Sequence, residues 1–428
     1  MACVGTDQTL LVVGGGISGL TAALEAAECG KTVILVERSP TLGGRTAQLY
    51  RYFPKLCHPL CGLEINLRRL QGQRRIQVLT LAEVTALTGA PGRYTATLTL
   101  HPRYVTEACT ACGDCARAAQ TEVPDAHNHG LSRHKAAYLP HAMAWPRRYV
   151  VDPVLVGTEE GARVQAACPY GAIDLSQQTE ALELTVGAVI WATGWKPYDA
   201  ARIQPYGYGR FRNVMTSVEF ERLADPQGPT GGRLLRPSEG REARNIAFIQ
   251  CAGSRDENHL RHCSRICCMA SLKQTRYVRE ACGDAGRSTI YYIDIRAIDR
   301  FEDFYQSVRQ DPAVTFVKSK VARIEEDGAS GDLILHGVDT EGYHRYATTH
   351  DLVVLAVGME PSVPADRLPQ GVTVDASGFL AAASGDAAGL IGAGCATNAL
   401  DVNRAVQSAT GAALRAIQVL HQIAGAGN

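Results

Sequence analysis

The chain has 428 residues, and its 43 basic and 43 acidic side chains give a formal net charge of zero. This length can form two or three domains with cores of their own, and the neutral balance gives no sign of a nucleic-acid partner or a lipid surface. The N-terminus runs into an apolar strand without a signal peptide, and no apolar run reaches the ~18 residues typical of a membrane-spanning helix. We therefore expect a soluble protein that contacts a membrane only through partners.

Fourteen cysteines are the most unusual part of the composition. In a small secreted domain they would indicate disulfide bonds. In a chain of this length without a signal peptide, metal ligation is the better interpretation.

The first predicted elements are a strand, a glycine-rich turn, a helix and a second strand, at residues 10–13, 14–19, 20–29 and 31–36. Gly14, Gly16 and Gly19 form the pattern G-x-G-x-x-G. These glycines permit a tight turn, a close approach to a pyrophosphate and close packing of helix on strand, and the pyrophosphate would meet free N–H groups at the helix N-terminus. Glu37, after the second strand, can accept hydrogen bonds from a ribose. The glycine pattern alone is weak, but its agreement with strand, helix and acid predicts a dinucleotide site. The predicted site also includes Ile17, Ser18 and Arg38.

Four later segments favour FAD over NAD in this first fold. Gly43-Gly44-Arg45 is similar to the second glycine pair that lies along the flavin in flavoproteins with two dinucleotide-binding domains. Ala192-Thr193-Gly194 follows an apolar strand, as the A-T-G segment of those proteins does, and residues 353–358 form another strand and turn. Gly394-Cys395 precedes Asp401-Val402 and a helical tail, where those proteins place the turn that covers the flavin. Each segment could be a generic strand and turn, and it is their order that supports FAD.

A ferredoxin-like cysteine run begins at Cys109, Cys112 and Cys115, but Ala119 stands where the fourth cysteine belongs. Cys168-Pro169 is similar to the end of a second run. In two-cluster ferredoxins the fourth cysteine of each run binds the other cluster, so the first three cysteines and Cys168 make one complete ligand set. The other set would fall on Ala119, Thr158, Gly161 and Val164. The pattern predicts a single [4Fe-4S] cluster in a fold built for two.

A second strand–helix–strand unit is predicted around residues 245–250, 269–280 and 289–295. A glycine-rich phosphate loop should follow its first strand, but only Gly253 is present there. The same region holds Cys251, Cys263, Cys267 and Cys268. Thiolates are the usual ligands of iron–sulfur clusters, whereas free cysteines are commonly buried for packing. Spacing alone leaves these two interpretations equally open.

The cysteine-rich sequences 251–256 and 262–269 resemble the signature of the heterodisulfide reductase A-like family. Residues 43–65 and 138–151 resemble one branch of that family, which belongs to the quinone-interacting membrane-bound oxidoreductase (Qmo) complex. The resemblance implies that the second cysteine group holds a [4Fe-4S] cluster and that FAD contacts the glycine segments named above. Cys57 and Cys61 lie in the Qmo-like segment and are interpreted as structural, with a redox role as the alternative.

We therefore predict an α/β flavoprotein with a Rossmann-like FAD domain, a degenerate second Rossmann-like domain and a ferredoxin-like insert. The FAD domain comprises residues 1–100, 176–200 and 351–428, the insert 101–175, and the second domain 201–350. Boundaries of this kind carry a margin of several residues.

The resemblance implies an oxidoreductase subunit that passes electrons between a membrane quinone module and adenylylsulfate reductase. Its partners would be a second heterodisulfide reductase A-like flavoprotein and a haem/iron–sulfur membrane subunit, which would place it at the cytoplasmic face of the inner membrane. Two alternatives are an autonomous NAD(P)H-dependent flavoprotein reductase and a non-catalytic scaffold that holds flavin. The missing phosphate loop opposes the first, and the eroded ligand set keeps the second open.

Overall fold

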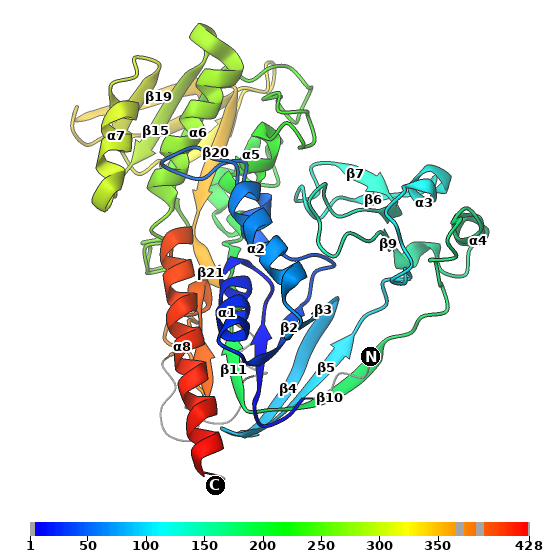
Figure 1. Ribbon diagram of the computed structural model, residues 1–428. Coiled ribbons are helices and arrows are strands. Elements are labelled where there is room, and N and C mark those ends of the chain that lie inside the picture. Colours follow the sequence, from blue (N-terminus) through cyan, green and yellow to red (C-terminus); the bar gives the residue numbers. More distant parts are fainter. Residues whose placement is uncertain (1–4, 364–367, 369–371, 382–388, 427–428) are drawn as a thin grey trace. The chain divides into compact units, whose positions relative to one another are not determined.

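The computed structural model describes residues 5–363, 368, 372–381 and 389–426 (Figure 1). The chain divides into two compact units. The first unit comprises Met1–Ala47, Leu60–Trp195 and Pro361–Asn428, and the second comprises Gln48–Pro59 and Lys196–Glu360. The predicted insert falls within the first unit and the predicted second Rossmann-like domain within the second.

The first unit contains a five-stranded parallel sheet with the order β22-β11-β1-β2-β3. Its strands are β1 (Thr9–Val13), β2 (Thr32–Glu37), β3 (Ile76–Thr80), β11 (Ala188–Trp191) and β22 (Leu390–Gly392). Its long helices are α1 (Ile17–Glu28), α2 (Leu60–Gly72) and α8 (Val402–Ala426). The sequence TLLVV of β1 is buried throughout, as expected for a parallel strand covered on both faces. Helices α1 and α8 lie side by side on one face (Figure 1).

The opposite face is covered by an antiparallel sheet with the order β10-β5-β4. Its strands are β4 (Ala82–Ala90), β5 (Arg93–Leu100) and β10 (Glu180–Val186). The ferredoxin-like insert leaves after β5 and returns before β10, with an apolar core of its own. Its elements are α3 (Asp114–Ala118), β6 (Glu122–Pro124), β7 (Arg133–Lys135), β8 (Ala137–Tyr138), β9 (Val150–Val151) and α4 (Glu159–Ala166). The amide of Trp145 donates to the Thr41 hydroxyl at 2.9 Å and so ties the insert to the rest of the unit.

The second unit contains another five-stranded parallel sheet, with the order β13-β20-β14-β15-β16. Its strands are β13 (Val214–Thr216), β14 (Asn245–Ala252), β15 (Arg287–Tyr292), β16 (Val314–Lys318) and β20 (Leu352–Val357). Its helices are α5 (Ser217–Ala224), α6 (Cys267–Cys282) and α7 (Glu302–Arg309). An antiparallel sheet joins β17 (Arg323–Glu326), β18 (Leu333–Asp339) and β19 (His344–His350). Two short strands, β12 (Trp195–Pro197) and β21 (Met359–Pro361), pair with each other.

The segment Gln48–Pro59, which the sequence analysis placed with the FAD domain, packs in the second unit. A buried ion pair anchors it, with Lys273 Nζ and Glu221 Oε1 at 2.9 Å. Lys273 also donates to the carbonyl of Arg51 at 2.6 Å, and Glu221 accepts from the amide of Tyr50 at 3.0 Å. Burial lowers the pKa of Lys273 despite its acidic partner. The two charges thus hold the backbone of two adjacent residues of the segment.

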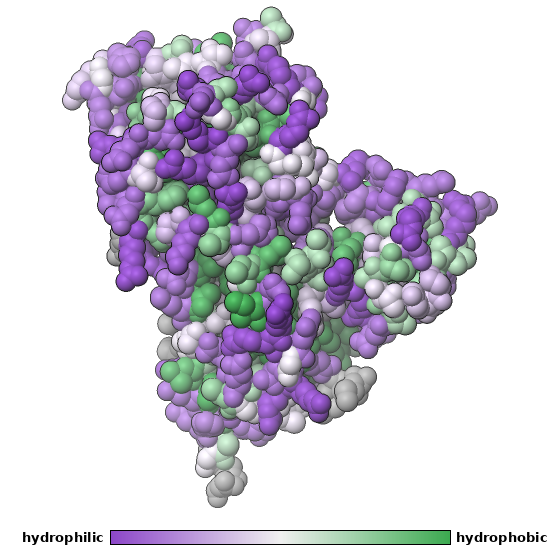
Figure 2. Space-filling view, turned by 45° about the horizontal axis from the view of Figure 1, so that its top comes forward, coloured by the Kyte–Doolittle hydropathy of each residue, from purple (hydrophilic) through white to green (hydrophobic). Residues whose placement is uncertain are grey.

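Hydrophilic residues cover most of the face shown in Figure 2, with hydrophobic residues between them. Exposed large apolar side chains are spread over several elements, including Ile65 on α2, Leu414 on α8 and Tyr170 in the insert.

Candidate functional site

The glycine turn after β1 is too crowded for side chains. Gly14 has a φ of +107°, and a Cβ atom there would lie 2.4 Å from the carbonyl oxygen of Ala192. A Cβ atom on Gly19 would lie 1.7 Å from the carbonyl oxygen of Gly14. Helix α1 begins at Ile17 after Gly16, and none of the side chains that the structure describes caps it. Its free N–H groups and uncharged first turn suit an anionic pyrophosphate.

The carboxylate of Glu37 lies beside this turn. One oxygen accepts from the amide of Gly15 at 2.6 Å and the other from the amide of Ser39 at 2.7 Å. Burial, with a smaller contribution from the positive charge of Arg38, lowers the pKa of Arg45. An acid suited to a ribose and two arginines suited to phosphate therefore lie near the same turn.

The second glycine pair packs directly on the first. The amide of Gly43 donates to the carbonyl of Gly15 at 2.9 Å, and a Cβ atom on Gly44 would lie 2.9 Å from the Cα of Gly16. The short 3-10 helix η1 (Gly44–Gln48) begins here. Arg45 Nε donates to the carbonyl of Trp195 at 3.3 Å, and its guanidinium lies over the indole ring.

The A-T-G segment leaves β11 beside β1, since the amide of Ala192 donates to the carbonyl of Val13 at 2.8 Å. The hydroxyl of Thr193 is buried and has no hydrogen-bond partner among the described residues. Gly194 follows with a φ of +70°. A buried hydroxyl without a partner is costly, and a bound ligand would satisfy it.

The C-terminal segment reaches the start of α1 as well. The 3-10 helix η9 (Gly394–Ala396) begins at Gly394, where a Cβ atom would lie 2.1 Å from the Ser18 hydroxyl oxygen. Cys395 is buried, and burial raises its pKa to about 11. Asp401 accepts from the amide of Arg404 at 3.0 Å just as α8 begins at Val402. The predicted flavin-site segments thus meet around the N-terminus of α1, and their donors fit a flavin dinucleotide.

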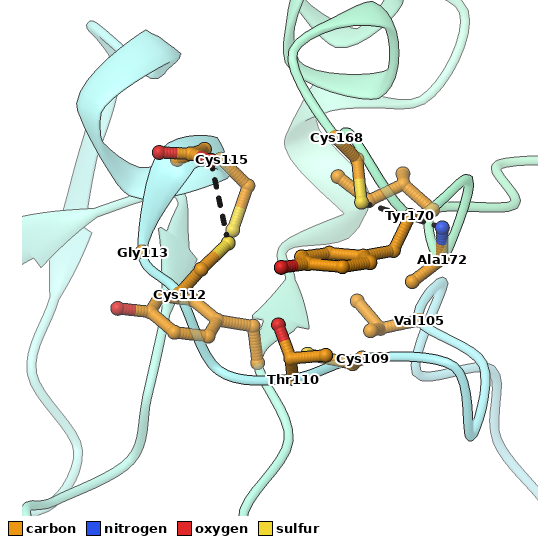
Figure 3. Close-up of a pocket in the computed structure, with 12 residues that line it drawn as sticks. Val105, Cys109, Thr110, Cys112, Gly113, Cys115, Cys168, Tyr170 and Ala172 are labelled. Carbon is orange, nitrogen blue, oxygen red and sulfur yellow. Dashed lines mark hydrogen bonds between the residues drawn. The ribbon is translucent and has the colours of Figure 1, made fainter.

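Four cysteines of the insert line one pocket of about 300 Å³, which is partly open to solvent (Figure 3). They are Cys109, Cys112, Cys115 and Cys168. Figure 3 shows Cys168 on the loop opposite Cys112 and Cys115, with the ring of Tyr170 in the opening. The amides of Ala111 and Ala172 donate to the sulfurs of Cys109 and Cys168 at 3.4 and 3.3 Å. Such hydrogen bonds stabilise cluster thiolates.

No group of three His, Cys, Asp or Glu side chains in the described part of the chain converges on the position of one metal ion. A [4Fe-4S] cluster makes a different demand, because each thiolate binds a different iron. Burial, reinforced by Cys109 and Cys112, raises the pKa of Cys115 to about 11. The positive charge of iron would offset this penalty. The four-thiol donor set therefore fits a cluster rather than a single ion.

The positions of the eroded ligand set form part of the insert core. Ala119 and Val164 are buried in it. Thr158 caps α4 by accepting from the amide of Gly161 at 3.0 Å. A Cβ atom on Gly161 would lie 2.1 Å from the carbonyl oxygen of Leu155. Apolar packing and a helix cap therefore occupy the place of a second cluster.

The second cysteine group lies at the carboxyl end of β14. Cys251, near the end of this strand, has a φ of +56°, and Cys267 and Cys268 are the first residues of α6. Cys263 lies in the loop before α6 and accepts from the amide of Arg265 at 3.3 Å.

The four thiols of this group are close enough to interact electrostatically. Burial raises the pKa of Cys267 well above its usual range, and negative charge on Cys251, Cys268 and Cys263 raises it further. Burial likewise raises the pKa of Cys268 to about 12. The positive N-terminal end of α6 acts in the opposite direction, because it favours thiolates. The group thus has the composition and placement of a four-thiolate cluster site.

Several residues at these sites were not predicted from the sequence. Tyr149 and Tyr170 line the pocket of the insert, and Arg255 and Asp294 lie at Cys251. Tyr170 could have been suspected because it follows Cys168-Pro169. Asp294 had no such signal, since it lies 39 positions from Arg255. Cys57 and Cys61 are both exposed, and their interpretation as structural stays a prediction.

Residues 9–120 match the family of FAD-dependent oxidoreductases. An iron–sulfur A-type protein of CoB–CoM heterodisulfide reductase from Methanopyrus kandleri is 37% identical over 427 residues, which cover 97% of this chain and 64% of that protein. The A-type protein of the ferredoxin:CoB–CoM heterodisulfide reductase from Methanosarcina mazei is 34% identical over 97% of this chain and 53% of its own length. The chain belongs to the heterodisulfide reductase A-like family.

This heterodisulfide reductase A-like chain thus spans between about half and two thirds of the length of these curated relatives. Among solved structures it is similar to the thioredoxin reductase of T. acidophilum, with a TM-score of 0.55, 14% identity and coverage of 97% and 99% of the two chains. The thioredoxin reductase of Lactococcus lactis gives a TM-score of 0.54 at 14% identity, again with 97% and 99% coverage. These similarities confirm the predicted fold of a flavoprotein with two dinucleotide-binding domains.

Proposed function

We propose that the chain is an electron-transfer subunit that holds FAD in its first unit, one [4Fe-4S] cluster in the insert and another in the second unit. The observation that carries this proposal is the presence, in one chain, of a dinucleotide cradle and two complete four-cysteine groups. When bound, FAD supplies two-electron chemistry and iron–sulfur clusters supply one-electron chemistry. The protein supplies orientation and electrostatics.

The carboxyl end of β14 supports this proposal over a nicotinamide-dependent reductase. Cys251 and the first turn of α6 occupy the place where a Rossmann unit binds pyrophosphate. Gly253, the remaining glycine, has another role, because a Cβ atom there would lie 2.3 Å from the ring of Tyr198. Close packing against this tyrosine therefore accounts for the glycine without a phosphate ligand.

The more specific part of the proposal is a place in a Qmo-like complex. It rests on the resemblance of residues 43–65 and 138–151. The partners would be a second heterodisulfide reductase A-like flavoprotein and a haem/iron–sulfur membrane subunit, with adenylylsulfate reductase as the cytoplasmic electron partner. Within the described ranges, no helix combines the length and apolar character needed to cross a bilayer. Membrane attachment at the cytoplasmic face would then depend on the partner subunits.

Ferredoxin is a second candidate partner, because it appears in the names of the relatives from Methanosarcina mazei and Methanothermobacter marburgensis. A pull-down with each candidate, followed by reduction of the flavin in the captured complex, distinguishes the two. Reduction by ferredoxin alone, without the quinone module or adenylylsulfate reductase, would contradict the Qmo-like assignment.

The cofactor content is tested by measuring iron and acid-labile sulfide per FAD in protein purified without oxygen. About eight iron atoms per FAD are expected, since each four-cysteine group holds four. About four would mean that one group is empty. Rapid bleaching of the flavin by NADPH would contradict the proposal, and cofactors that never reduce at any accessible potential would favour a scaffold.

A further inference from the structure

The guanidinium of Arg255 lies between a cysteine of the second group and a carboxylate. Its Nη1 atom is 3.9 Å from the sulfur of Cys251 and 2.5 Å from Oδ1 of Asp294. The Arg255 side chain is 22% exposed, compared with 46% for Asp294. The cation is therefore more sheltered from solvent than its carboxylate partner.

Asp294 closes this arrangement from the other side. Its carbonyl oxygen accepts from the thiol of Cys268 at 3.6 Å, while its side chain holds Arg255. Arg296 also faces it, with Nε 3.4 Å from the same carboxylate oxygen. Arg255 thus joins the loop after β14 to the loop after β15, at the carboxyl edge of the sheet where such folds bind their ligands.

The backbone around Arg255 is fixed by local contacts. Both Cys251 and Arg255 have a φ of +56°, which is uncommon for residues with a side chain. The amide of Arg255 donates to the carbonyl of His262 at 3.1 Å, and the amide of Ser254 donates to the carbonyl of Cys251 at 3.2 Å. Residues kept in this region of φ and ψ need surroundings that determine them. The loop is therefore built to keep the Arg255 side chain at Cys251.

We propose that Arg255 is a positioning residue that raises the reduction potential of the cluster held by Cys251, Cys263, Cys267 and Cys268. This inference rests on the proposed function, because it requires a cluster in the second unit. Reduction adds one electron, supplied by the flavin or by a redox partner, and so leaves one more negative charge at the cluster. A fixed positive charge near a ligating sulfur stabilises the reduced state more than the oxidised state.

A simpler role would be a salt bridge that only joins two loops. Exposed ion pairs contribute little to stability, and a purely structural pair would leave the potential unchanged. The difference between the two roles is therefore a potential, which can be measured independently of turnover.

The test is a redox titration of the purified holoprotein followed by electron paramagnetic resonance. A Cys263→Ala variant identifies the signal of this cluster by losing it. In Arg255→Gln, the ratio of reduced to oxidised cluster at a fixed potential should fall about tenfold, a shift of about 59 mV for a one-electron couple. Arg255→Lys keeps the charge and should lie between this variant and the wild type.

Two further variants complete the design. Asp294→Asn removes a negative charge and should shift the potential upward. Arg276→Gln is the matched control, because Arg276 pairs with Asp311 at 3.0 Å in the same unit and has no contact with the four cysteines among those the structure describes. It should leave the potential unchanged.

Wild-type potential in Arg255→Gln with full iron content would overturn the inference, as would an upward shift. If Arg255→Gln loses iron, Arg255→Lys and Asp294→Asn decide the question, and unchanged potentials in both would overturn it. If the wild type shows no signal that Cys263→Ala removes, the proposed function fails at this site instead. The two failures are therefore distinguishable.

Discussion

Glu160 on α4 accepts hydrogen bonds from both the amide and the hydroxyl of Thr121, at 2.8 and 2.7 Å. A third bond comes from the amide of Gln120 at 2.7 Å. These bonds join α4 to the segment that follows Ala119. A second cluster in a two-cluster ferredoxin fold would join the same two segments through its ligands. In this insert a carboxylate makes that connection.

Replacing Glu160 by Ala should therefore loosen the insert. The bonds from Thr121 and Gln120 lower the pKa of Glu160, so its contribution is present above the ordinary value of 4.5 and is lost as the pH falls below it. Glu160→Ala should cost about 1 kcal/mol at neutral pH and should speed hydrogen exchange at the amides of Gln120 and Thr121. Glu159→Ala, the adjacent acid in the same helix turn, should leave these amides protected. Equal exchange in the two variants would contradict the clamp.

Cys168 should be required for iron in the insert although it lies far along the chain from the other three cysteines. Cys168→Ala removes one of four thiolates from the pocket, and iron per FAD should fall by about half because one of two clusters is lost. Cys57→Ala, which removes an exposed cysteine outside the pocket, should keep the full iron content. Full iron in Cys168→Ala would refute the crossed ligand set.

Gly14→Ala should abolish FAD binding, because the added Cβ would lie 2.4 Å from the carbonyl oxygen of Ala192 and strain a φ of +107°. Gly30→Ala is a matched control, since Gly30 has a φ of +87° but nothing within 4 Å of an added Cβ. It should cost only about 1 kcal/mol of backbone strain and should keep the flavin. Flavin absorbance per protein measures both effects, and flavin retained by Gly14→Ala would place the dinucleotide elsewhere.

His350 should make the second unit sensitive to acid. Burial lowers its pKa from 6.5 to about 4, and its ring contacts the hydroxyl of Tyr291 at 2.9 Å and the amide oxygen of Asn245 at 3.1 Å. Because the unfolded chain takes up this proton more readily, the free energy of unfolding should be greatest above pH 6.5 and fall towards pH 4. The change should approach roughly 3 kcal/mol.

The measurement is denaturant unfolding at pH 7.5 and pH 5, compared between wild type and His350→Gln. The variant should be less stable at pH 7.5 but should lose less stability on acidification. His336→Gln serves as the control, because the partner of His336 is the half-exposed Glu325. The same pH dependence in wild type and His350→Gln would show that other groups cause it.

The sequence was most informative where local patterns determine structure. Strand β1, the glycine turn and α1 lie where the glycine spacing predicts them, because the crowding around Gly14 and Gly19 excludes any other residue. The substitution of Ala119 likewise indicated a core position rather than a ligand, and the residue is buried.

The sequence was silent where contacts join distant segments. Gln48–Pro59 belongs to the second unit because Glu221 and Lys273 bind the backbone of Tyr50 and Arg51. A buried pair of opposite charges has no periodic pattern that would reveal its partner. The contact between Arg255 and Asp294 escaped prediction for the same reason, since it forms only when two loops meet at the edge of the sheet.

The packing of Gly253 against Tyr198 also bears on the evolutionary history of the second unit. The tyrosine ring is almost fully buried, and its hydroxyl is bonded to His259 at 2.7 Å. The space beside the glycine is therefore filled by a ring that the fold holds in place. Restoring glycines after β14 would not by itself recreate a nicotinamide enzyme, because the ring would still have to move. Once this contact had formed, a return to the ancestral chemistry required several simultaneous changes.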